Sequence, residues 1–153
     1  MIGIQQLDLP QIPEQIIESL DSVRAKQEFL PLRHHVSAEL QDYLQTIFRD
    51  PITATYGILV ANHGPHTDYS GREFGYNYIL QQGGRHVVTS MYDNDMNVTQ
   101  QVVCQPKIWY RIHTGNWHSV HGIESGQSRF LISVTYLHDI INPRAKVVYH
   151  PRL

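Results

Sequence analysis

The strongest constraint on the fold is a change of pattern at Ile52. From there onward, short runs rich in β-branched and aromatic residues alternate with clusters of glycine, asparagine, aspartate and serine. Such runs are typical of strands, and such clusters are typical of turns. The pattern predicts strands at Thr53–Ala61, Gly75–Leu80, Arg85–Tyr92, Lys107–His113, His118–Val120, Arg129–Leu137 and Lys146–His150. A series of short strands of this kind favours a β-sandwich or barrel.

Two amphipathic helices are predicted before this region. The first has Pro13 in a position suited to a first helical turn and ends before Pro31, and its apolar residues are Ile16, Ile17, Leu20 and Val23. The second has Ser37 as its N-cap and ends at Asp50-Pro51, and its apolar residues are Leu40, Tyr43, Leu44, Ile47 and Phe48. Both apolar stripes favour packing against a sheet over binding a partner.

Length and composition indicate one globular domain. The chain has 153 residues, with residues 1–51 expected as a helical flank and residues 52–153 as a β-barrel core. Its apolar content of 41% supports a buried core, and its net charge of -2 argues against a nucleic-acid binder. Cys104 is the only cysteine, which excludes an internal disulfide framework. No secretory signal or membrane span is predicted, so we expect a cytoplasmic protein.

The segment His66-Thr67-Asp68 is the central candidate for chemistry. In a strand, residues two apart point to the same face, so this segment presents an imidazole and a carboxylate to one point. A histidine from a distant strand would complete a triad of two histidines and one carboxylate, the arrangement of non-haem Fe(II) oxygenases. His118 begins a candidate strand 50 residues after Asp68. We therefore predict that His66, Asp68 and His118 bind a metal ion.

Two other assignments of the metal ligands stay open. His121 could replace His118, but it lies three positions further on and would face the opposite side of a regular strand. His63 and His66 could join Cys104 in a zinc site. The glycine and proline between the two histidines favour a loop, which would place His63 beside the metal rather than on it.

Arg129 opens an apolar run eleven residues after His118. If the run is a strand, one of its faces carries Arg129, Leu131, Ser133 and Thr135. A guanidinium inside a barrel needs an anionic partner, and a dicarboxylate ligand would supply one, with Ser133 adding a hydroxyl. The alternative is an exposed Arg129 that pairs with Glu124.

Taken together, the segments H-T-D, H-S-V and R-F-L-I-S resemble the 2-oxoglutarate/Fe(II)-dependent dioxygenase superfamily, most closely its prolyl hydroxylase-like and aspartyl/asparaginyl β-hydroxylase-like members. The resemblance covers roughly residues 53–137. It implies a mainly β fold, a double-stranded β-helix (jelly-roll, cupin-like) barrel with two flanking N-terminal α-helices. It also implies Fe(II) as the metal and 2-oxoglutarate as the cosubstrate, and the cosubstrate contacts that it implies are Arg129, Ser133 and Tyr78.

The activity implied by this resemblance is the hydroxylation of an amino-acid side chain, free or peptidyl, or of another small molecule. Dioxygen would be consumed, and 2-oxoglutarate would be converted to succinate and carbon dioxide. Two other functions stay open: a non-catalytic cupin-like module that keeps the fold for binding, and a cupin metalloenzyme that reacts without 2-oxoglutarate. A metal triad combined with Arg129 favours the oxygenase, because a binding module needs neither.

Overall fold

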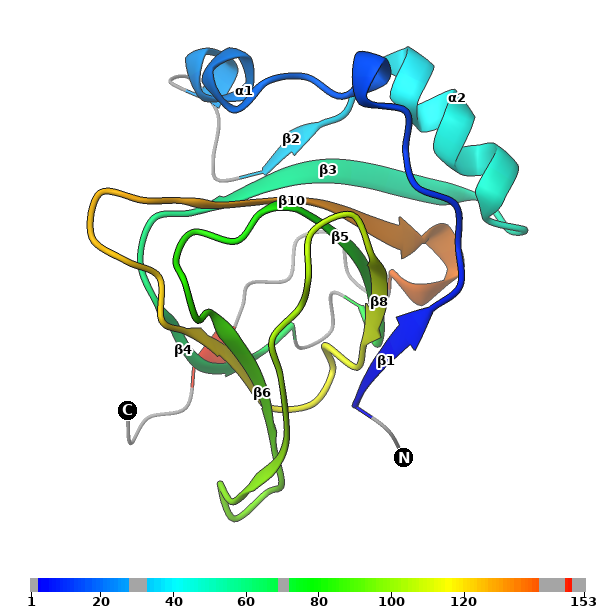
Figure 1. Ribbon diagram of the computed structural model, residues 1–153. Helices are drawn as coiled ribbons and strands as arrows, with labels where there is room; N and C mark the ends of the chain where they lie inside the picture. Colours follow the sequence, from blue (N-terminus) through cyan, green and yellow to red (C-terminus); the bar gives the residue numbers. More distant parts are fainter. Residues whose placement is uncertain (1–2, 28–32, 69–71, 141–147, 150–153) are drawn as a thin grey trace.

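The computed structural model describes residues 3–27, 33–68, 72–140 and 148–149. Its strands form two antiparallel sheets (Figure 1). The six-stranded sheet contains, in spatial order, β1 (Ile4–Leu7), β8 (Trp109–Ile112), β5 (Gly75–Gln81), β10 (Arg129–Tyr136), β3 (Ile52–Leu59) and β2 (Arg33–His35). The five-stranded sheet contains β11 (Val148–Tyr149), β4 (His63–Thr67), β9 (His118–His121), β6 (Val88–Tyr92) and β7 (Val98–Val102).

The chain winds back and forth between these two sheets. The strands β3, β5, β8 and β10 belong to the six-stranded sheet. Between them, the chain crosses to the five-stranded sheet three times, to form β4, then β6 and β7, and then β9. This alternation closes a barrel whose interior lies between the sheets. The fold is the mainly β, cupin-like double-stranded β-helix that the resemblance implies.

Two helices flank the barrel, as expected. The helix α2 (Ala38–Ile47) begins where predicted, because the Ser37 hydroxyl accepts a hydrogen bond from the Leu40 amide at 3.2 Å. The helix α1 (Leu20–Gln27) begins later than predicted, since only a 3₁₀ turn, η1 (Glu14–Ile16), follows Pro13. Within the described residues, no helix combines the length and the apolar character that crossing a membrane requires.

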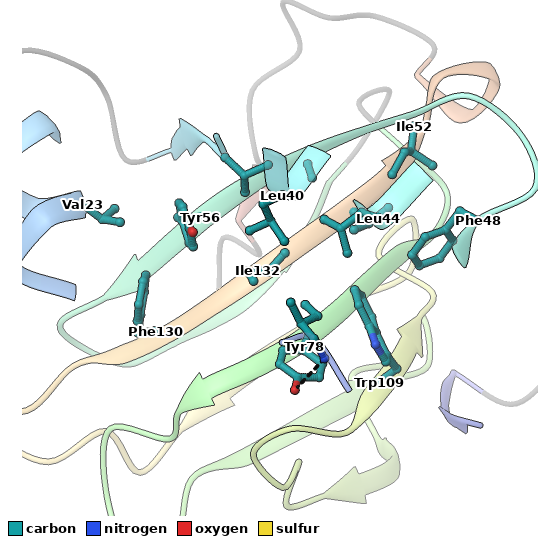
Figure 2. Packing of buried hydrophobic residues seen from close by; sticks show 14 of the residues in the cluster. Val23, Leu40, Leu44, Phe48, Ile52, Tyr56, Tyr78, Trp109, Phe130 and Ile132 are labelled. Atoms are coloured by element: carbon teal, nitrogen blue, oxygen red, sulfur yellow. Dashed lines mark hydrogen bonds between the residues drawn. The ribbon is translucent and has the colours of Figure 1, made fainter. Parts of the chain in front are cut away.

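The main hydrophobic core lies between the helices and the outer face of the six-stranded sheet. Figure 2 shows side chains of α1 and α2 directed toward those of β3, β5, β8 and β10. Its largest fully buried members are Trp109, Tyr56, Tyr78, Leu40, Leu44, Ile132, Val23 and Val134. The apolar stripes of the helices therefore pack against a sheet, as predicted.

The strand β10 separates this core from the barrel interior. Phe130, Ile132 and Val134 belong to the core beneath the helices. Leu131 and Ser133 alternate with them and line a cavity inside the barrel. The shared face predicted for the run that begins at Arg129 is thus the face that looks into the barrel.

Four strands were not predicted, namely β1, β2, β7 and β4, and in β4 the glycine and proline between His63 and His66 were expected to form a loop. Each has only three to five residues, and β1 and β7 contain consecutive glutamines rather than a clear apolar alternation. β1, β2 and β7 lie at the edge of a sheet, where their backbone pairing, rather than a buried side-chain pattern, defines them, whereas β4 pairs with β9 and β11 on its two sides. The last predicted strand, Lys146–His150, is present at Val148–Tyr149, and its other residues lie outside the described residues.

Candidate metal centre

The five-stranded sheet brings the three predicted metal ligands together. His66 on β4 is the direct partner of His118 on β9, and Asp68 follows β4 by one residue. The Asp68 Oδ1 atom lies 3.8 Å from Nε2 of His66 and 3.8 Å from Nε2 of His118. All three side chains are buried, and in the described part of the chain they are the only group of histidine, cysteine and acidic residues placed to hold a metal ion.

Both imidazoles are oriented by backbone carbonyls. The Nδ1 atom of His66 lies 2.7 Å from the Gly64 carbonyl oxygen, and Nδ1 of His118 lies 2.8 Å from that of Asn116. Because a carbonyl oxygen only accepts, Nδ1 carries the proton in each ring and Nε2 keeps its lone pair. Burial also lowers the pKa of His118, which favours the neutral ring that a metal requires.

Asp68 is held by Arg72, a residue that the sequence analysis did not select. Arg72 Nε donates to Asp68 Oδ2 at 2.9 Å, so Oδ1 is the oxygen that faces the histidines. Arg72 Nη1 also donates to Ser133 Oγ at 2.7 Å and to Thr135 Oγ1 at 2.8 Å. The Asp68 amide donates to the Thr114 carbonyl at 2.8 Å, which fixes the backbone of the ligand as well.

This donor set fits a divalent metal ion. Metal bonds to histidine nitrogen and carboxylate oxygen are about 2.0–2.2 Å long, so atoms 3.8 Å apart can share one ion. Two imidazoles and one carboxylate suit Fe(II), and the same ligands also accept Mn(II), Co(II), Ni(II) and Zn(II). His66, Asp68 and His118 would hold the ion, each through the atom that already faces the other two.

The triad opens into a cavity of about 310 Å³ between the sheets. Its walls combine apolar and polar side chains, among them Thr55, Asn77, Thr89, Val120 and Leu131. Arg72 and Arg129 also line it, and Asp68 is the only acidic residue among the described ones that line it. The described walls therefore carry two guanidinium groups and one carboxylate, before any metal ion adds further positive charge.

Arg129 is buried at the start of β10, with 2% of its surface exposed. Its Nη2 atom lies 3.4 Å from Thr89 Oγ1, and Nη1 has no hydrogen-bond partner among the described residues. Burial lowers the pKa of Arg129, which reflects the cost of keeping this charge out of water. Glu124 pairs instead with Arg85, at 3.3 Å, so the alternative of an exposed Arg129–Glu124 pair does not form.

Of the two other predicted cosubstrate contacts, Ser133 lines the cavity and Tyr78 does not. Ser133 lines the cavity, but its hydroxyl already accepts from Arg72. Tyr78 needs a correction: it faces the core beneath the helices, where its hydroxyl accepts from the Ile12 amide at 3.3 Å (Figure 2). Its neighbour Asn77 lines the cavity instead, and its Oδ1 atom has no hydrogen-bond partner in the described residues.

The remaining alternatives for the metal ligands are resolved by position. His121 is exposed, as strand parity predicts. The ring of His63 lies against that of His66, with centroids 3.9 Å apart, and it lines the cavity beside the triad. Cys104 is buried in a second apolar cluster inside the barrel and takes part in no group that could hold a metal among the described residues.

Comparison with known proteins identifies no family. No protein-family model matches the sequence, and no curated protein is a significant match. Solved structures with a similar fold include an oxalate decarboxylase of Lactobacillus farciminis in a formate complex (12% identity, 76% of this chain and 30% of that chain, TM-score 0.45). An oxalate decarboxylase variant of Bacillus subtilis has 9% identity (65% and 24%, TM-score 0.44). The cysteine peptidase peruvianin-I of Thevetia peruviana latex has 17% identity (64% and 56%, TM-score 0.44). The chain thus matches from about a quarter to just over half of the length of these proteins.

Proposed function

We propose that this protein is an Fe(II)- and 2-oxoglutarate-dependent oxygenase that hydroxylates a small molecule or an amino-acid side chain, free or peptidyl. The observation that carries the proposal is the buried Arg129 in the same cavity as the His66, Asp68 and His118 triad. A buried guanidinium whose Nη1 atom has no partner among the described residues calls for an anionic ligand. A dicarboxylate that reaches from the metal to Arg129 would meet both requirements.

In this proposal, the protein binds and orients the reactants. His66, Asp68 and His118 hold the metal, and Arg129 forms a charge-assisted pair with the distal carboxylate of 2-oxoglutarate. The apolar side chains of Leu131 and Val120 line the cavity and reduce the access of water. When bound, Fe(II) supplies the redox chemistry that couples the conversion of 2-oxoglutarate and dioxygen to succinate and carbon dioxide with the insertion of one oxygen atom into a C–H bond.

A second candidate is a cupin metalloprotein that does not use 2-oxoglutarate. One observation favours it: the Ser133 hydroxyl, which was expected to contact the cosubstrate, is already bonded to Arg72. A metal centre with its own arginine network could serve a different reaction, or binding alone. This candidate keeps the same three metal ligands and differs only in what occupies the cavity.

The experiment that separates the two candidates is anaerobic addition of Fe(II) and 2-oxoglutarate to the metal-free protein. We expect a visible metal-to-ligand charge-transfer band from the iron chelate of 2-oxoglutarate. The band should be lost in Asp68→Ala, and a higher 2-oxoglutarate concentration should be needed in Arg129→Met. Arg85→Met removes an exposed arginine that pairs with Glu124 outside the cavity, and it should behave as the wild type.

The other outcomes have distinct meanings. Iron binding without a charge-transfer band would reject 2-oxoglutarate and favour a cupin of different chemistry. An equal effect of Arg85→Met and Arg129→Met would reject the role of Arg129. If no iron bound, the metal centre itself would be rejected.

A further inference from the structure

The two carboxylate oxygens of Asp68 have different surroundings. Oδ1 lies 3.8 Å from Nε2 of each histidine of the triad, whereas Oδ2 accepts from Arg72 Nε at 2.9 Å. We infer that Arg72 is a positioning residue that makes Asp68 a one-oxygen ligand, so that a metal coordination position next to Asp68 stays open for an exchangeable ligand. This inference rests on the metal site of the proposed function, but not on the identity of the cosubstrate.

Arg72 is itself held in place from the opposite sheet. Its Nη1 atom donates to the hydroxyls of Ser133 and Thr135 on β10, at 2.7 and 2.8 Å, and its side chain is only 10% exposed. The planar guanidinium can bond to a carboxylate and to two hydroxyls at the same time, which a lysine ammonium on a flexible stem does less well. The side chain therefore ties Asp68 to β10 across the cavity.

This arrangement limits how Asp68 can bind a metal. A carboxylate can coordinate through one or both oxygens, and the second oxygen of Asp68 would have to leave a buried ion pair to do so. Separating a buried pair is strongly unfavourable, because it leaves an uncompensated charge. With one oxygen from Asp68 and two imidazoles, an octahedral ion keeps three positions for other ligands; with two oxygens it keeps two.

The number of open positions can be measured with Mn(II) alone, without activity. Manganese favours octahedral oxygen-rich sites, and water in its open positions raises the relaxation rate of solvent protons. We expect the relaxivity of bound Mn(II) to fall by about one third in Arg72→Met, as three bound waters become two. Arg72→Lys should give an intermediate relaxivity, because lysine keeps the positive charge but lacks the planar guanidinium that bonds to Asp68 and to both hydroxyls at once. Arg85→Met makes the same change in net charge away from the cavity and should leave the relaxivity unchanged.

The possible results test the role of Arg72 and the proposed function separately. An unchanged relaxivity in Arg72→Met would overturn the inference and leave the metal site intact. A folded Arg72→Met that no longer binds Mn(II) would also overturn it, because Arg72 would then be needed for binding itself. Failure of the wild type to bind Mn(II), Co(II) or Fe(II) would instead remove the proposed function.

A second variant keeps the test decisive if Arg72→Met does not fold. Ser133→Ala combined with Thr135→Val retains Arg72 and its charge but removes both hydroxyls that hold Nη1. We expect a fall in relaxivity in the same direction, of smaller size, with a circular dichroism spectrum like that of the wild type. If the relaxivity of this double variant equals that of the wild type, the role of Arg72 in fixing Asp68 is contradicted.

Discussion

His66 and His118 are direct partners across β4 and β9, and their ring centroids lie 4.1 Å apart. Each ring is fixed by its own backbone carbonyl, at Gly64 or Asn116, within two residues of the histidine. The orientation of both Nε2 atoms is therefore set locally on each strand, and the sheet register sets the distance between them. Such a site is preorganised and needs little rearrangement to bind a metal ion.

The first prediction concerns the metal ligands. His118→Ala should weaken Co(II) binding at least about 100-fold, because loss of a ligand should exceed the 10- to 100-fold effect of losing a supporting contact. Isothermal titration calorimetry of the metal-free protein checks this. His121→Ala removes an exposed histidine from the same strand and should bind Co(II) like the wild type. Equal weakening by both substitutions would contradict the assignment of His118.

The second prediction concerns the stability of the metal-free protein at acid pH. Burial lowers the pKa of His118 in the folded state, so below the ordinary histidine pKa of about 6.5 the unfolded state binds the proton more readily. The free energy of unfolding should therefore fall as pH drops from about 6.5 toward the lower folded-state pKa. His118→Gln should remove up to about 1.4 kcal/mol per pH unit of this slope.

Urea titrations between pH 7 and pH 5 would measure this effect. His121→Gln serves as the control, because it removes an exposed histidine from the same strand. A steeper acid limb in His118→Gln than in the wild type would show that the sign of the effect is opposite to the one argued from burial.

The third prediction concerns the buried charge of Arg129. In the absence of a ligand, Arg129→Met should raise the free energy of unfolding by roughly 1–3 kcal/mol, because it replaces a desolvated and incompletely bonded guanidinium with an apolar side chain of similar length. At a fixed 2-oxoglutarate concentration, the same substitution should reduce the thermal stabilisation that this ligand gives to the metal-loaded protein, because binding is weaker.

Denaturant unfolding and thermal shift assays test the two effects of Arg129→Met separately. Arg85→Met should change stability by less than about 0.5 kcal/mol, because the Arg85 side chain is 93% exposed. A marked loss of stability in Arg129→Met without ligand would indicate that Arg129 is a structural residue rather than a ligand-binding one.

The fourth prediction uses two neighbours on β5 that face opposite sides of the sheet. Tyr78→Phe should lower the free energy of unfolding by about 0.5–1.5 kcal/mol, because the Ile12 amide loses its acceptor, and should leave ligand binding unchanged. Asn77→Ala should weaken binding of the ligand that occupies the cavity, with a smaller effect on stability. Calorimetry and denaturant unfolding of both variants would reveal a reversed pattern if Tyr78 were the cavity residue.

Patterns within single segments could be read from the sequence. The N-cap of α2 at Ser37, the alternation along β10 and the same-face placement of His66 and Asp68 all follow from local backbone geometry. These rules, together with the spacing of the strand-like runs, were sufficient for a β-sandwich or barrel and for placing His66 and Asp68 together. The double-stranded β-helix was implied by the resemblance of the three motifs to a known superfamily.

For a strand that is covered on both faces, the tertiary structure decided which face lines the barrel cavity. On β5, both Tyr78 and Asn77 sit at positions compatible with burial, and strand parity separates their faces without saying which one lines the cavity. The docking of the helices on the outer face resolved the choice by covering Tyr78.

The partners of Arg72 were also decided only by the tertiary structure. Ser133 and Thr135 lie 61 and 63 residues away from it along the chain, so no local pattern connects them. The sequence determined which residue types were available for a metal site and that His66 and Asp68, two residues apart, could share a face. The packing of the two sheets determined that a guanidinium reaches from Asp68 to β10, because such a contact depends on the separation and register of strands that are distant in sequence.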